Sequence, residues 1–109
     1  MVTDNAVQKY VLVQVKHMGE ERFFVRGDAD AAYHKDAVRP FVTHLRSLNV
    51  PYTVLGGGRI DHNTAMKSIK IFGFSYGFPW QSEPMHEVAA KQLQKDYPGF
   101  AVSTSNDGY

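Results

Sequence analysis

The five histidines are the side chains of this sequence best suited to acid–base chemistry, since cysteine is absent. Without cysteine the chain forms no disulfide, thiolate zinc site, iron–sulfur cluster or cysteine nucleophile. His34 stands at the expected start of a helix, where the first N–H groups and the helix dipole favour an oxyanion such as phosphate. A histidine there could serve as base or acid beside the anion, or could be an ordinary surface residue at a helix end.

The other four histidines have simpler interpretations. The segment 86–90 begins like the metal-binding helix of a zinc protease, but Ala90 occupies the place of its second histidine. We therefore interpret it as an ordinary helix start and expect no metal site. His17 in a turn and His44 on a helix are expected at the surface, whereas His62 could be structural or part of a site.

Three consecutive glycines, at positions 56–58, could bring the backbone close to a ligand, with Arg59 beside it. They do not form a Walker loop, because no Gly-Lys pair occurs in the chain. They are not a dinucleotide fingerprint either, because Asp61 occupies the third glycine position. The alternative is a bulge or bend in a sheet.

Alternating apolar residues predict the strands that carry these groups. Residues 9–16 and 22–26 form two strands joined by a short turn, which favours a hairpin. Four further strands are expected over 51–55, 59–62, 67–75 and 100–104. The hairpin makes a purely parallel sheet impossible, so we expect a mixed sheet.

Two helices are predicted from apolar periodicity. The first begins near 31–33 and ends near 47–49, and Pro40 should kink it or lie close to its start. The second covers 85–97 and stops at Pro98. We therefore predict an α/β fold of the α+β type, a single domain in which a mixed sheet of about six strands is flanked by two helices. Residues 1–8 are polar and expected to be a flexible N-terminus before a domain over 9–109.

Composition narrows the classes of partner. Twelve basic and eleven acidic residues give a net charge of +1, which offers no electrostatic case for nucleic acid. No apolar run approaches the roughly 20 residues of a membrane span, and the first residues do not resemble a signal peptide. We expect a cytoplasmic monomer that binds neither nucleic acid nor membranes.

Several strings combine into a resemblance to the protein histidine phosphatase family, also called the Janus family. In order along the chain they are Lys9-Tyr10-Val11-Leu12, Val25-Arg26-Gly27, Tyr33-His34, Leu55-Gly56-Gly57-Gly58-Arg59-Ile60 with His62, Phe72-Gly73-Phe74-Ser75 and Asn106-Asp107-Gly108-Tyr109. The resemblance extends from about Lys9 to Tyr109. It implies a metal-independent phosphatase without cofactor that acts on phosphohistidine in proteins or peptides and on other phosphoramidates.

The resemblance also implies roles for individual residues. His34 matches the catalytic proton acceptor, and Lys9 matches a lysine that contacts substrate. Arg26 and Arg59 match arginines that line the site. The backbone that holds the phosphate matches Ser75, Tyr76 and Gly77, where the family more often has methionine and alanine after the serine.

From these residues two mechanisms stay open. Neutral His34 could take a proton from the attacking water, or it could attack phosphorus directly and form a phospho-enzyme. Positive charge would come from the lysine and the two arginines, and N–H groups near Lys35 and the serine would bind phosphate oxygens. The alternative function is a non-catalytic phosphate- or phosphopeptide-binding module on the same fold.

Overall fold

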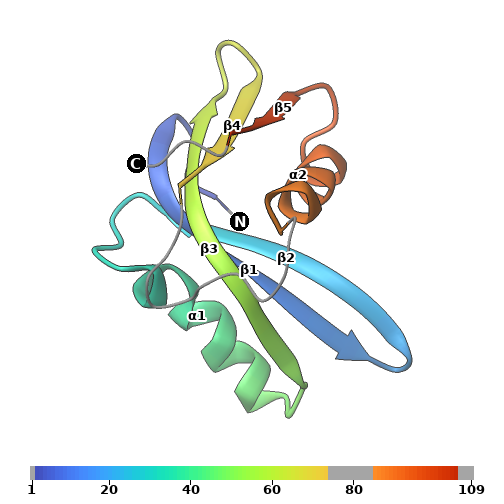
Figure 1. The fold of residues 1–109 in the computed structure, drawn as a ribbon. Helices are drawn as coiled ribbons and strands as arrows, with labels where there is room; N and C mark the ends of the chain where they lie inside the picture. The colour runs from blue at the N-terminus through green and yellow to red at the C-terminus, as the bar shows by residue number, and fades with distance from the viewer. Residues whose placement is uncertain (1, 74–84, 106–109) are drawn as a thin grey trace.

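One mixed sheet forms the centre of the molecule (Figure 1). The structure is a computed structural model that describes residues 2–73 and 85–105. Within these residues the strands and helices are β1 (Ala6–His17), β2 (Glu20–Asp28), α1 (His34–Ser47), β3 (Tyr52–Asn63), β4 (Ser68–Phe72), α2 (Met85–Asp96) and β5 (Ala101–Thr104). The sheet order is β2-β1-β3-β4-β5, antiparallel except between β4 and β5. The predicted mixed sheet flanked by two helices is confirmed.

The two helices cover opposite faces of this sheet (Figure 1). Val11, Val13 and Val15 of β1 pack against α1, whereas Tyr10 and Leu12 pack on the side of α2. This alternation is the period-two pattern of a strand that is buried on both faces. A side chain on β1, β3 or β4 can therefore be assigned to the α1 face or the α2 face from its register.

The number of strands differs from the prediction. Five strands lie within the described residues, because the predicted strands 51–55 and 59–62 are one strand, β3. The glycines between them continue the pairing with β1 through a register shift, in which Val13 pairs with Val54 and Leu12 pairs with Gly56. Leu55 is the extra residue of this β-bulge, so the interpretation of the glycine run as a bulge is confirmed.

The predicted hairpin and the predicted bounds of the first helix are confirmed. Met18 and Gly19 connect β1 to β2, and both have positive φ, as a tight two-residue hairpin turn requires. α1 begins at His34 and ends at Ser47. Pro40 lies in its middle at an exposed position, so the expectation that the helix might begin close to this proline is wrong. No helix within the described residues is long and apolar enough to cross a membrane.

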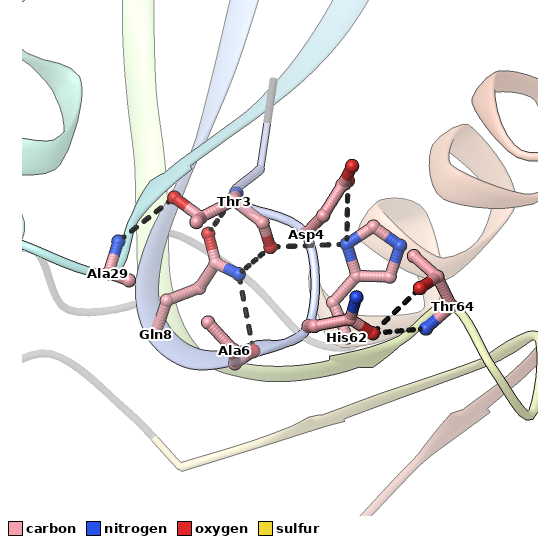
Figure 2. A network of polar contacts seen from close by, with 8 residues as sticks. Thr3, Asp4, Ala6, Gln8, Ala29, His62 and Thr64 are labelled. Carbon is pink, nitrogen blue, oxygen red and sulfur yellow. Dashed lines mark hydrogen bonds and ion pairs between the residues drawn. The ribbon is translucent and has the colours of Figure 1, made fainter.

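Residues 2–8 are attached to the sheet (Figure 2), and β1 begins three residues earlier than expected. The backbone N–H of Thr3 donates to Oε1 of Gln8 over 2.6 Å, and Nε2 of Gln8 donates back to the Thr3 carbonyl over 2.7 Å. Nδ1 of His62 lies 3.2 Å from the same carbonyl, and Val2 packs into the core. His62 is thus a buried residue that helps to hold the N-terminal segment.

Replacing Gln8 by alanine should weaken this attachment. The side chain is 3% exposed, and its loss leaves two backbone groups of Thr3 without their present partners. We expect the free energy of unfolding to fall by about 1–2 kcal/mol. Urea unfolding of Gln8→Ala beside Gln14→Ala measures it, since Gln14 lies on the same strand but its bond to Glu21 is exposed. Equal loss in both variants would contradict the prediction.

Candidate active site

His34 is the first residue of α1. One hydrogen bond fixes the helix start beside it, and another fixes its ring. Tyr33 is the N-cap, and its backbone N–H donates to the Asp36 carboxylate over 3.2 Å. The His34 side chain is 9% exposed, and its Nε2 lies 2.9 Å from the carbonyl oxygen of Gly58. A carbonyl only accepts, so Nε2 carries the proton and Nδ1 is the basic nitrogen of the neutral ring.

Two cations, Lys9 and Arg59, act on His34. They are direct partners across β1 and β3 and lie on the face covered by α1. Burial lowers the pKa of His34, and the charges of Lys9 and Arg59 lower it further, while the hydrogen bond to Gly58 opposes them. The histidine is therefore held neutral beside fixed positive charge, the arrangement that a general base or a nucleophile for a phosphoryl group needs.

The bulge at Leu55 is what brings Arg59 to this face. Before the bulge, Val54 packs on the α1 side; unbroken alternation that included Leu55 would direct Arg59 to the α2 side. With the bulge, Arg59 is on the α1 face beside Lys9, and Gly58 is on the α2 face. The bulge thus absorbs Leu55 and keeps Arg59 in register beside Lys9.

Lys35 lies at the helix start but extends outward. Its side chain is exposed, and its Nζ lies 5.6 Å from the centre of the Tyr33 ring. The N–H groups of Asp36 and Ala37 both bond to the Tyr33 carbonyl. The backbone N–H of Lys35 precedes them in the first turn, where no helical carbonyl can accept it, so this group suits an anion.

The guanidinium of Arg26 is held by aromatic side chains of β2 and α1. Its guanidinium stacks 4.4 Å from the ring centre of Phe41 and 5.0 Å from that of Phe24, and it donates to the Val25 carbonyl. Burial lowers its pKa, but an arginine stays charged. Phe41 is two helical turns beyond His34, about 10 Å along the axis. The guanidinium borders a surface pocket of about 380 Å³ beside α1.

Comparison with known proteins decides the family. The model of the Janus/Ocnus family matches residues 1–101. The chain belongs to this family. It is similar to a protein named 14 kDa phosphohistidine phosphatase from Sus scrofa, with 30% identity over 115 residues that cover 99% of this chain and 89% of the relative. The human protein of the same name is 29% identical, with 99% and 90% covered. The sex-regulated protein janus-A of Drosophila orena is 30% identical, with 99% and 78% covered.

The predicted phosphate-binding segment of this Janus/Ocnus family member, Ser75, Tyr76 and Gly77, lies outside the described residues. Its role stays a prediction. Gly73, the last described residue before it, is buried and has a φ of 71°, which favours glycine.

Sequence reasoning missed Tyr10 and His86 in this Janus/Ocnus protein. The Tyr10 hydroxyl lies 2.8 Å from Nδ1 of His86, and Nε2 of His86 lies 3.0 Å from the Gly73 carbonyl. His86 was interpreted only as a helix start, yet it makes contacts on the far side of Gly58. The available signal was Tyr10 itself, because a phenol on the inner side of an apolar strand needs a hydrogen-bond partner.

The remaining histidines do not join the site. His17 and His44 are exposed, as predicted, and His62 is buried beneath Tyr97 and Phe100. Among residues 2–73 and 85–105, no three metal-ligating side chains come together.

Proposed function

We propose that this protein is a protein histidine phosphatase, which hydrolyses the P–N bond of phosphohistidine in proteins or peptides. The observation that carries the proposal is a neutral His34, fixed by Gly58 through Nε2, beside the cations Lys9 and Arg59. The names of the porcine and human relatives agree with it. Other phosphoramidates have the same P–N bond and are expected to be alternative substrates.

In the proposed mechanism, His34 acts as a general base. Nδ1 takes a proton from water while the water oxygen bonds to phosphorus, and the P–N bond breaks. The substrate ring carries a proton on its other nitrogen, so the electron pair of the P–N bond leaves on a neutral imidazole, a good leaving group, and His34 then releases its proton to solvent. Lys9, Arg59 and the N–H of Lys35 stabilise charge on the phosphoryl oxygens. This scheme needs no metal or cofactor.

The decisive experiment is hydrolysis of a phosphohistidine peptide with and without a chelator. We expect phosphate release at the same rate in both. A protein that binds the peptide but releases no phosphate would be the non-catalytic binding module instead. Activity that disappears with the chelator and returns with a metal would overturn the metal-free scheme.

The acid side of the pH profile should lie below the ordinary histidine range. Because the pKa of His34 is lowered, the midpoint of the fall in kcat/KM on the acid side should lie below the ordinary histidine value of about 6.5. Activity declines only when the pH falls through the lowered value and the ring takes up a proton. An acid-side midpoint of kcat/KM at or above pH 6.5 would contradict this assignment.

Removing the charge of Lys9 should move that profile in a defined direction. Lys9 lowers the pKa of His34, so Lys9→Met should shift the acid side of the profile to higher pH, apart from any loss of substrate binding. Lys16→Met is the matched control, since Lys16 is an exposed residue near the other end of β1. The two variants are compared by the pH at the acid-side midpoint of kcat/KM, not by the maximum value of kcat/KM. A shift in the control alone, or none in either variant, would remove Lys9 from the site.

A further inference from the structure

The side chains of Tyr10 and His86 contact Gly58 on the α2 side of β3. A Cβ placed on Gly58 would lie 3.1 Å from Cε1 of Tyr10 and 3.0 Å from Cε1 of His86. It would lie 2.6 Å from the carbonyl oxygen of Phe72 on β4. Two rings and a neighbouring strand therefore enclose Gly58, and its carbonyl oxygen accepts the hydrogen bond from His34.

The orientation of the two rings is fixed by hydrogen bonds. Nε2 of His86 faces the Gly73 carbonyl, which only accepts, so this nitrogen carries the proton. Nδ1 is then an acceptor for the hydroxyl of Tyr10. Burial raises the pKa of Tyr10 well above its usual range, so the phenol remains a donor. Each polar atom of the pair has a defined role, although the two residues are 76 positions apart in sequence.

We propose that Tyr10 and His86 are positioning residues for His34, which they hold through the contact with Gly58. The inference rests on the proposed function for its effect on turnover. Removal of the rings allows the Gly58 peptide to move away from α1, so its carbonyl no longer fixes Nε2 of His34. Displacement of a reacting group by about 1 Å lowers turnover by up to about 10²-fold.

The pKa of His34 responds to the same contact. The hydrogen bond to Gly58 raises this pKa, whereas burial and the charges of Lys9 on β1 and Arg59 on β3 lower it. On α1 itself, Lys35 and Asp36 are the neighbouring charged groups. A weaker bond to Gly58 therefore shifts the His34 titration to lower pH. A general loss of stability would not shift the titration of this one histidine to lower pH.

The test measures two quantities in His86→Ala, His86→Gln and Tyr10→Phe. The first is the midpoint of the His34 ring-proton titration by NMR, without substrate, assigned with His34→Asn. The second is kcat and KM for a phosphohistidine peptide. Leu93→Val is the control, because Leu93 is a buried residue of the same helix that belongs to the hydrophobic core.

In His86→Ala we expect the His34 midpoint to fall and kcat to decrease about tenfold or more, with a smaller change in KM. Tyr10→Phe should show the same changes to a lesser degree. His86→Gln keeps an N–H that can donate to Gly73 and should recover part of kcat. Leu93→Val should leave both quantities as in the wild type.

Two results would overturn the inference: an unchanged His34 midpoint in folded His86→Ala, or the same change of midpoint in Leu93→Val. Absence of phosphate release by the wild-type protein would instead overturn the proposed function. The NMR titration would still decide whether Tyr10 and His86 position His34.

Discussion

His34→Asn should lower kcat for phosphohistidine-peptide hydrolysis by about 10²–10⁴-fold, the usual contribution of a general base. Asparagine is polar but cannot take up a proton near neutral pH. The fold should persist, since the variant loses one hydrogen bond to Gly58, a change of about 1 kcal/mol. His34→Ala should show the same loss of kcat. Circular dichroism and thermal unfolding check the fold, and phosphate release checks activity.

A second histidine on the same helix supplies the control for this substitution. His44 is exposed and lies near the end of α1, so His44→Asn should keep wild-type kcat. Near-wild-type turnover by His34→Asn would exclude His34 as base and as nucleophile. Activity lost equally in both variants would indicate damage to α1 rather than loss of a reacting group.

The two mechanisms for His34 can be separated in the wild-type protein. Direct attack by Nδ1 gives a phosphoryl group on the protein, whereas the general-base scheme does not. We expect no labelled protein when a reaction with radioactively labelled phosphohistidine peptide is stopped rapidly under alkaline denaturing conditions. Label that appears in wild type and not in His34→Asn would establish the phospho-enzyme.

Local patterns explain which parts of the fold could be predicted. The apolar face of α1 and the alternation of β1 are visible within a short stretch of sequence, so the helix start at His34 and the hairpin were predicted correctly. The continuity of β3 was not, because three glycines look like an interruption when the pairing with β1 is unknown. Nothing in the sequence around Leu55 indicates that it is the extra residue of a bulge.

The features of the site that the sequence did not predict depend on contacts between residues far apart in the chain. Lys9 and Arg59 were both named as site residues, but their proximity depends on a register that only the bulge sets. Arg26 was named with them, but its stacking on Phe41 joins β2 to α1 and could not be predicted from either segment alone. Tyr10 signals locally that it needs a partner, but nothing local identifies His86 as that partner, since the pair joins the first strand to the second helix.

Gly58→Ala should affect both stability and activity, because the new methyl group has no room. Its nearest atom would be the Phe72 carbonyl oxygen at 2.6 Å, a backbone atom that cannot rotate away as a side chain could. β3 must therefore shift relative to β4. We expect the free energy of unfolding to fall by about 3 kcal/mol, at the upper end for overpacking. The shift also displaces the carbonyl that holds His34, so kcat should fall in the fraction that remains folded.

A glycine outside the site separates these two effects. Gly19 has a φ of 80°, and nothing lies within 4 Å of a Cβ added to it, so Gly19→Ala loses stability through backbone strain alone. It should keep wild-type kcat at a temperature where both variants are folded. Removing the His86 side chain from Gly58→Ala should restore neither property, because the closest clash is with the backbone of Phe72. If Gly58→Ala kept wild-type kcat, the Gly58 carbonyl would not be what orients His34 for the reaction.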